Sequence, residues 1–380
     1  MGTIGVFTGS RSEYGLLVPV MQAIDVHPDL TLAVISADPE TLAAEFPVAA
    51  HAPIRRHDET PSSTPRAIGQ GVLDLTAVFD RYPLDALVIY GDRFEAFAAM
   101  IAATQRGLPT AHIEGGDLTQ GGTLDDVVRH AMSKLAHLHF PTNAAAAERL
   151  RAMGEENWRI TTAGFPPIDL INAGDYAPAE EVAETLGIDP SAPLILFTQH
   201  PISTDPDAAA ADIAQCMAAL TALAGEAQIV LTHPNGDVGS DVIIAALEAF
   251  HSTFPQTVLR PTLGRRLYHG MLNICGTGQG VCVGNSSSGL KETPAFHCPA
   301  VDIGPRQSGR LRGENVLPVE SDAAAIEAAI RSALFDPALR DKLRRAANPY
   351  GQGNAGPTIA RILGETDLAE PKLIQKQTLL

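Results

Sequence analysis

Short apolar runs, many of them β-branched, alternate along the chain with longer segments of helical period. This alternation is typical of parallel sheets covered by helices. In the first half the pattern predicts strands at residues 3–7, 32–35, 86–90, 110–113, 138–140 and 159–162. Helices fit between these strands, for example at residues 14–24 and 125–136.

A second series of strands is predicted at residues 194–198, 228–232, 257–260, 281–283 and 300–303. The Gly-Phe-Pro-Pro segment at 164–167 interrupts the rhythm and is typical of a linker. We therefore predict an α/β protein with two doubly wound, Rossmann-like domains and an interdomain cleft, where ligands bind at the carboxyl ends of strands. The predicted parts are a first domain at 1–165, a second domain at 166–352, a helix at about 353–366 that packs back on the first domain, and a loose tail at 367–380.

Composition excludes several classes of protein. The chain has 380 residues and a net charge of −17, which argues against a nucleic-acid backbone as partner. No apolar run approaches the length of a membrane span, and the strand-like start does not resemble a signal peptide. The four cysteines lack paired metal-ligand spacing and are expected to be buried thiols. We expect a cytoplasmic protein without a bound metal.

The Gly-Asn-Ser-Ser-Ser-Gly segment at 284–289 is the strongest chemical signal. It follows an apolar run and precedes a predicted helix at 288–296, so unpaired amides and the hydroxyls of Ser286, Ser287 and Ser288 are available to a phosphate. Glu292 stands about one turn further on, within reach of a sugar diol, and Arg310 belongs to a following arginine loop that can neutralise phosphate charge. A serine cap before a surface loop is the alternative, but the combination favours a nucleotide-diphosphate site.

Polar groups also follow the strands of the first half. Arg11 follows the first strand, Asp92 follows the strand at 86–90, and Glu114 lies beside two glycines that leave room for a ligand. The alternatives are a solvated arginine and an aspartate that caps a helix.

Asp125 and Arg129 share one face of the predicted helix at 125–136, where an ordinary surface ion pair is the alternative. Asp92, Glu114 and Asp125 are expected to converge on one cleft. Such a set divides acid and base roles, because burial and mutual repulsion separate the pKa values of its members.

Two histidines follow strands of the second half, His200 and His233. His200 is the better ligand candidate because it is predicted to open into the cleft, although many loop histidines bond backbone. The Gly-Thr-Gly-Gln-Gly segment at 276–280 is rejected as a dinucleotide site, since a strand follows it where that motif requires a helix.

In the order and spacing of its motifs, over roughly residues 3–360, the chain resembles the hydrolysing UDP-N-acetylglucosamine 2-epimerases, which open the sialic-acid pathway, and their relatives that act on diacetamido-trideoxy sugars. The motifs that carry the resemblance lie at 8–15, 91–93, 112–117, 125–130, 284–289 and 304–315. The resemblance implies a fold of the kind found in two-domain GT-B glycosyltransferases. It also implies anti elimination of UDP to a 2-acetamidoglucal, followed by syn hydration to N-acetylmannosamine.

Under this resemblance the catalytic carboxylates fall on Asp92, Glu114 and Asp125. The loop at 120–123 looks longer than the usual one, which makes Asp126 an alternative to Asp125. Groups that bind the UDP-sugar fall on residues of both domains. These are Arg11, Arg129, His200, Ser286, Ser287, Ser288, Glu292 and Arg310.

We expect an enzyme that needs no cofactor, binds neither nucleic acid nor membrane, and forms a homodimer or homotetramer. A non-hydrolysing 2-epimerase, a GT-B glycosyltransferase and a non-catalytic nucleotide-sugar sensor remain alternatives. The sugar, N-acetylglucosamine or a 2,4-diacetamido-trideoxy relative, stays open, and so does the nucleobase.

Overall fold

The computed structural model describes residues 2–38, 45–58, 60, 62–119, 125–202 and 205–377. These residues form two compact units, each with six parallel strands in its described part. The described residues of Met1–Leu118, Asp125–Leu170 and Tyr350–Leu380 form unit 1, and those of Ile171–Pro349 belong to unit 2. This topology confirms the two predicted doubly wound domains.

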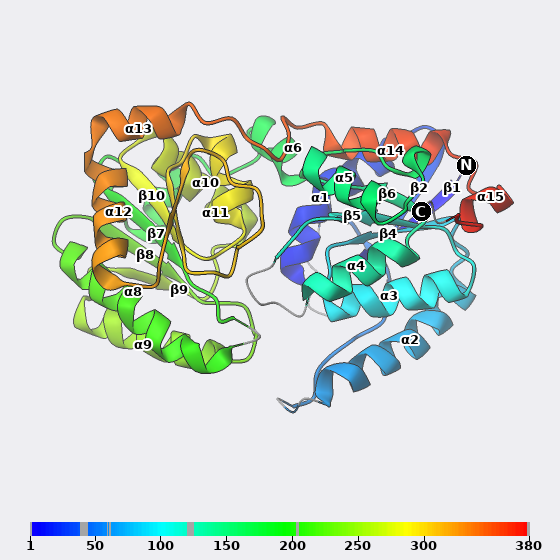
Figure 1. The fold of residues 1–380 in the computed structure, drawn as a ribbon, viewed down its shortest axis with the longest axis horizontal. Coiled ribbons are helices and arrows are strands. Elements are labelled where there is room, and N and C mark those ends of the chain that lie inside the picture. The colour runs from blue at the N-terminus through cyan, green and yellow to red at the C-terminus, as the bar shows by residue number, and fades with distance from the viewer. Residues whose placement is uncertain are drawn as a thin grey trace. The chain divides into compact units, whose positions relative to one another are not determined.

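The sheet of unit 1 has the strand order β3-β2-β1-β4-β5-β6 (Figure 1). Its strands are β1 Gly2–Thr8, β2 Leu30–Ser36, β3 Val48–His51, β4 Ala86–Tyr90, β5 Thr110–Ile113 and β6 Leu138–Phe140. Its helices are α1 Arg11–Asp25, α2 Ser63–Arg81, α3 Phe94–Gln105, α4 Asp125–Leu135, α5 Ala144–Ala152, α14 Ala355–Glu365 and α15 Pro371–Ile374.

Helices cover this sheet through apolar faces. Leu75 of α2, Met100 of α3 and Met132 of α4 share one buried core with Phe7 and Ile89 of the strands. Helices α1 and α14 pack so closely that a Cβ atom at Gly356 would lie 2.3 Å from the carbonyl oxygen of Pro19. The C-terminal helix therefore belongs to unit 1.

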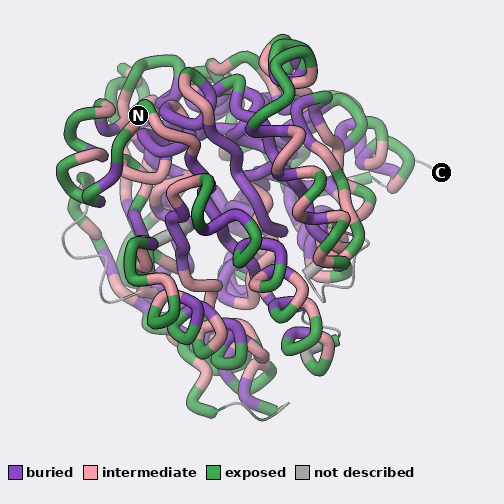
Figure 2. The backbone as a smooth tube through the Cα atoms, turned by 90° about the vertical axis from the view of Figure 1, so that its left-hand side faces the viewer, coloured by how far each residue is buried: buried purple, intermediate pink, exposed green. Residues whose placement is uncertain are grey.

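The sheet of unit 2 has the order β12-β11-β10-β7-β8-β9. Its strands are β7 Leu194–Thr198, β8 Gln228–Thr232, β9 Val258–Arg260, β10 Gly280–Gly284, β11 Ala300–Ile303 and β12 Val316–Val319. Its helices are α7 Ala179–Leu186, α8 Ala209–Leu223, α9 Ser240–Thr253, α10 Gly264–Thr277, α11 Ser288–Lys291, α12 Ala323–Phe335 and α13 Pro337–Arg344. Helices α8, α9 and α12 contribute to one core, and α7 and α10 contribute to the other. Buried positions run along the strands, while the outer helix faces are exposed (Figure 2).

The strand order reverses direction once in each sheet. In unit 1 the chain moves from β1 to one edge and then restarts at β4, and in unit 2 it does the same from β7 and β10. Ligands of doubly wound sheets bind at the carboxyl ends of the strands on either side of such a reversal. Ligand-binding residues are therefore expected in the segments that follow β1, β4, β7 and β10.

Most predicted strands are confirmed, and the errors lie at the sheet edges. The strands predicted at 86–90, 110–113, 138–140, 194–198, 228–232 and 300–303 have the predicted bounds. The strand predicted at 159–162 is wrong: Thr161 and Ala163 donate to carbonyls of residues 139 and 141, but only a single bridge forms. The edge strands β3 and β12 were not predicted. Pro318 in β12 is tolerated because an edge strand does not need every ladder amide.

The predicted helix at 288–296 is also wrong in part. It divides into α11 and a 3-10 helix, Thr293–Phe296, because Pro294 cannot continue the backbone hydrogen bonds of α11. Near the predicted linker at 164–167, a short helix α6, Pro167–Asn172, contains the division between the units at Leu170 and Ile171.

The prediction of a loose tail is wrong for residues 367–377, the part of the tail that the structure describes. Helix α15 docks on unit 1, its Leu373 is 1% exposed, and the Arg159 guanidinium donates to the Leu373 carbonyl at 2.6 Å. The tail is ordered because the buried guanidinium of Arg159 requires hydrogen-bond acceptors, and the carbonyl of Leu373 is one of them. Within the described residues, no helix has the length and apolar character that a membrane span requires.

Candidate active site

Two residues that follow strands of unit 1 turn through left-handed backbone conformations. Gly91, after β4, has a φ of 71°, and Glu114, after β5, also has a φ of 71°. A non-glycine residue rarely adopts this conformation, and it persists where the surroundings enforce it. The Glu114 amide donates to the Phe140 carbonyl at 3.1 Å, and its buried carboxylate accepts a hydrogen bond from the Tyr90 hydroxyl. Glu114 is therefore held in one orientation at the sheet edge.

Arg129 of α4 joins this edge from the helix side. Its side chain is 1% exposed and forms an ion pair with Asp92. Its guanidinium also donates to the Asp117 carbonyl at 3.1 Å and to the Asp126 carboxylate at 3.1 Å. Burial alone would lower the pKa of Arg129, but Asp92, Glu114 and Asp117 raise it. The structure thus brings Asp92, Glu114 and Arg129 into one electrostatic group.

The third predicted carboxylate is only partly placed. Asp125 is the first residue of α4, but its side chain lies outside the described structure, as does the loop at 120–123. Of the two neighbouring aspartates at the start of α4, Asp126 has a described side chain, and it pairs with Arg129 at i,i+3, in addition to the pair of Arg129 with Asp92. The alternative interpretation, a surface ion pair of Asp125 with Arg129, is wrong because the side chain of Arg129 is buried.

His112 of β5 supports the same edge, and sequence reasoning did not include it among the site residues. Its Nε2 atom lies 2.7 Å from the Gly91 carbonyl oxygen, next to Asp92. Burial lowers the pKa of His112 to about 4, so the ring is neutral and Nε2 donates to that carbonyl. A Cβ atom at Gly115 would lie 2.9 Å from both His112 Nδ1 and Ser133 Oγ, so a residue larger than glycine would crowd these two side chains.

Helix α1, which follows β1, carries a further buried carboxyl group, that of Glu13, near Asp92. Ser10 caps α1, and Arg11 is exposed as its first helical residue, outside the Asp92–Arg129 pair. Glu13 is 4% exposed, and burial together with Glu95 raises its pKa to about 8. A protonated carboxyl at neutral pH was not predicted here.

In unit 2 the loops after β7 and β10 are joined by one buried amide. The Asn285 side chain accepts from the His200 amide at 2.7 Å and donates to the His200 carbonyl at 2.8 Å. Gly284 has a φ of 131°, and a Cβ atom there would lie 1.8 Å from the Thr198 carbonyl oxygen. Only glycine permits this approach.

Asn235 holds the ring of His200. The Nδ1 atom lies 3.1 Å from the backbone amide of Asn235, which donates, and 3.1 Å from its side-chain oxygen, which accepts, so these contacts fit either neutral tautomer. Burial, followed by the charge of Arg306, lowers the pKa of His200 to about 3. The imidazole of His200 is therefore neutral over the whole neutral range.

The serine turn exposes its hydroxyls in part, but the helix that follows it is shorter than predicted. Ser286, Ser287 and Ser288 are all partly exposed, and Ser286 with Gly289 lines a small hollow at the ends of β10 and β11. Since α11 spans only Ser288–Lys291, its dipole is weak. Hydroxyls and individual amides, rather than a helix dipole, are what this turn offers a phosphate.

Two residues of α10 support the serine turn, and neither was predicted. The Tyr268 hydroxyl is hydrogen-bonded to the Ser288 hydroxyl. His269 Nε2 lies 3.2 Å from the carboxylate of Glu292, and both side chains are buried. No sequence signal linked this helix to the serine turn, because neither residue belongs to a recognised motif.

The arginine loop folds back on the serine turn. Arg306 donates to the Asn285 carbonyl at 3.1 Å, and Gln307 donates to the same oxygen at 2.8 Å. Arg310 donates to the Gln307 side chain at 2.9 Å. Hydrogen bonds therefore tie the arginine loop to the serine turn and place the positive charge of Arg306 beside it.

Comparison with known proteins gives consistent matches. The sequence model of the family described as UDP-N-acetylglucosamine 2-epimerase matches residues 35–364. The UDP-N,N'-diacetylbacillosamine 2-epimerase (hydrolyzing) of Legionella pneumophila is 30% identical over 367 residues, which is 94% of each chain. The UDP-N-acetylglucosamine 2-epimerase of Neisseria meningitidis serogroup B is 30% identical over 341 residues, 88% of each chain.

Solved structures match the fold. The structure of UDP-GlcNAc 2-epimerase from Neisseria meningitidis bound to UDP-GlcNAc has a TM-score of 0.83, with 18% identity, and covers 96% of this chain and 100% of that one. The structure described as S. aureus MnaA with UDP has a TM-score of 0.79, with 18% identity and 96% of each chain covered.

Proposed function

The chain belongs to the UDP-N-acetylglucosamine 2-epimerase family, and we propose that it catalyses the hydrolysing form of this reaction. In that reaction a UDP-2-acetamido sugar and water give UDP and the free sugar inverted at C2. The observation that carries the proposal is the group formed by Asp92, Glu114 and Arg129 at the carboxyl edge of the first sheet. The relative from Legionella pneumophila, which matches nearly the whole chain, is named as a hydrolysing enzyme.

The first step is an elimination. A carboxylate removes the C2 proton, the C1–C2 double bond forms, and the C1–oxygen bond breaks with its electrons on the departing diphosphate. Asp92 is suited to act at the sugar, because its ion pair with Arg129 fixes its orientation. Glu114, oriented by Tyr90, is suited to stabilise positive charge that develops at C1.

The second step is a hydration. Water adds its oxygen to C1 of the glucal, and C2 receives a proton on the same face. Acid and base roles are exchanged between the steps, which requires carboxyl groups whose proton affinities differ. A group with a raised pKa, such as Glu13, is available near Asp92 as a source of protons for this exchange.

Unit 2 supplies the groups that suit UDP. The hydroxyls of Ser286 and Ser287 and the charge of Arg310 favour a diphosphate that gains charge as it leaves, and the neutral ring of His200 is suited to hydrogen-bond it. Glu292, held by His269, is suited to accept from the ribose hydroxyls.

UDP-N-acetylglucosamine is the substrate that we propose first. A UDP-2,4-diacetamido-2,4,6-trideoxy sugar is a second candidate, because the relative named for UDP-N,N'-diacetylbacillosamine matches more of the chain than the one named for UDP-N-acetylglucosamine.

Incubation of the purified protein with each of the two UDP-sugars in deuterated water tests the proposal. We expect stoichiometric UDP and a free 2-acetamido sugar deuterated at C2, because the base exchanges its proton with solvent between the two steps. The better substrate is the one with the higher kcat/KM. A UDP-linked epimer would instead support the non-hydrolysing reaction, and a free sugar without deuterium would exclude elimination.

A matched pair of variants separates chemistry from binding. Asp92→Asn should lower turnover by about a hundredfold, the usual scale for a lost acid–base group, while UDP affinity stays within about twofold. Asp85→Asn, at an exposed carboxylate that precedes the same strand, should behave as the wild type.

A further inference from the structure

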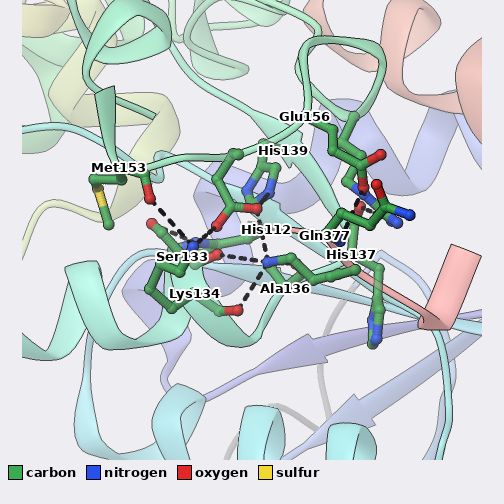
Figure 3. Close-up of polar contacts among 12 residues, drawn as sticks. His112, Ser133, Lys134, Ala136, His137, His139, Met153, Glu156 and Gln377 are labelled. Carbon is green, nitrogen blue, oxygen red and sulfur yellow. Dashed lines mark hydrogen bonds and ion pairs between the residues drawn. The ribbon is translucent and has the colours of Figure 1, made fainter. Parts of the chain in front are cut away.

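The C-terminal segment of the chain ends in an unusual contact. The ammonium group of Lys376 lies at the carboxyl end of α4, where it donates to the carbonyl oxygens of Ala136 at 2.6 Å, Lys134 at 2.8 Å and Ser133 at 3.4 Å. Figure 3 shows Ser133, Lys134 and Ala136 close together at this end of the helix. The last carbonyls of a helix lack partners within the helix, and a positive charge is favourable there. A side chain from far along the sequence therefore caps α4.

Lys376 is also tied to the sheet. Its ammonium lies 2.7 Å from the fully buried carboxylate of Glu155, which accepts from Lys134 at 2.6 Å and pairs with His139 of β6 at 2.9 Å. Burial would raise the pKa of Glu155, but hydrogen bonds from these three residues lower it to about 2. Glu155 is therefore ionised at neutral pH, and its contacts connect the tail, α4 and β6. Burial lowers the pKa of Lys376, while the hydrogen bond to Glu155 acts in the opposite direction.

The tail that carries Lys376 is itself fixed. The Arg159 guanidinium donates to the carbonyls of Leu373 at 2.6 Å and Lys372 at 2.9 Å. The Gln377 amide donates to the Glu156 carboxylate at 3.3 Å, and that carboxylate also accepts from Arg159 at 2.6 Å. Lys376 is thus anchored from both sides along the chain.

The other end of α4 carries the site. Arg129 pairs with Asp92, and the Ser133 hydroxyl bonds the Arg129 carbonyl at 2.9 Å and lies 3.5 Å from His112 Nδ1. Arg129 and two of the residues whose carbonyls Lys376 contacts, Ser133 and Lys134, belong to one helix of 11 residues, and the third, Ala136, directly follows that helix. Because a single short helix moves as a rigid body, a displacement at its carboxyl end shifts Arg129 and with it Asp92.

We propose that Lys376 is a positioning residue for the epimerase reaction: it holds α4 from its carboxyl end so that Arg129 sets the orientation of Asp92. Lys376 touches no reacting group in this scheme. The inference rests on the proposed function for its kinetic readout, but its structural part is independent of turnover.

Lys376→Met removes the charge and keeps the aliphatic chain. We expect kcat to fall by about tenfold while KM and the Kd of UDP stay within about twofold, because small misplacements of a reacting group cost rate rather than affinity. Lys376→Arg, which keeps the charge and donors, should restore kcat to within about threefold of the wild type. Lys372→Met is the matched control, since it removes an exposed charge of the same tail.

Hydrogen–deuterium exchange provides a readout that needs no turnover. In Lys376→Met, peptides from 125–135 should exchange faster, while peptides from β4 and α2 exchange as in the wild type. If the wild type itself shows no turnover, the proposed function fails, and this exchange still decides whether Lys376 holds α4.

Unchanged kcat and unchanged exchange in a folded Lys376→Met variant would overturn the proposal. So would exchange that accelerates across the whole of unit 1, because that result indicates general stability alone. If the Met variant does not fold, Lys376→Gln decides the matter. It keeps donors but lacks charge, so a lowered kcat with normal KM supports positioning, and a wild-type kcat contradicts it.

Discussion

His112 should make the stability of unit 1 depend on pH in a way that one substitution removes. Burial lowers its folded pKa from the ordinary 6.5 to about 4, and the charge of Arg129 acts in the same direction. The unfolded chain therefore binds a proton at His112 more readily than the folded one. The contribution of this neutral histidine is fully present above the ordinary pKa and is lost as pH falls from 6.5 towards 4.

The size of the effect follows from the shift. One pKa unit corresponds to about 1.4 kcal/mol, so the shift of His112 corresponds to about 3 kcal/mol once the pH is below both values. At about pH 5 most of the unfolded chains but few folded ones are protonated at this ring, and the loss is about 2 kcal/mol. This loss is a large part of the free energy of unfolding of an ordinary domain, which is about 5–15 kcal/mol.

Urea unfolding at several pH values measures this loss. Trp158 is the single tryptophan of the chain and lies in unit 1 with His112, so its fluorescence reports the unfolding of the relevant unit. His112→Gln keeps a donor for the Gly91 carbonyl but does not titrate. Relative to wild type, its free energy of unfolding should fall about 2 kcal/mol less between about pH 7.5 and 5. His57→Gln replaces an exposed histidine of the same unit and should keep the wild-type dependence.

Parallel curves for the wild type and His112→Gln would refute this reasoning. That result would mean that the folded protein accepts a proton at His112 as readily as the unfolded chain, and that a neutral ring bonded to the Gly91 carbonyl is the wrong description. Other groups that titrate in this range, among them His137, affect both proteins equally and cancel in the difference.

Three further predictions concern the reaction. Asp125→Asn should lower turnover by about a hundredfold and Asp126→Asn by much less; the opposite order in steady-state kinetics would show that Asp126 is the catalytic residue. Ser287→Ala and Glu292→Ala should each weaken UDP binding by about ten- to a hundredfold in calorimetry, the scale of a lost hydrogen bond to a charged group, and unchanged affinity would mean that the serine turn is not the diphosphate site. His269→Gln should weaken UDP binding by about tenfold or less, with kcat unchanged, because it releases Glu292 without removing it; an effect on kcat alone would contradict this role.

Local sequence determined much of the fold. The strands at 86–90, 110–113, 194–198 and 228–232 were predicted with correct bounds, because continuous runs of β-branched and apolar residues suit strands buried on both faces. The polar groups that follow them were predicted for the same reason, since the end of a buried run places the next residues at the sheet edge. Edge strands such as β12 lack this pattern and were missed.

Tertiary structure alone decided how these groups are paired. Arg129 reaches Asp92 across 37 positions of sequence, and Lys376 reaches the end of α4 across 240. Hydrophobic period and turn chemistry are local signals that extend over a few residues, so they predict which side chains stand at a sheet edge. Which buried charge meets which carbonyl or carboxylate depends on the desolvation of both partners in the folded state, and that property exists only once the helices have packed on the sheet.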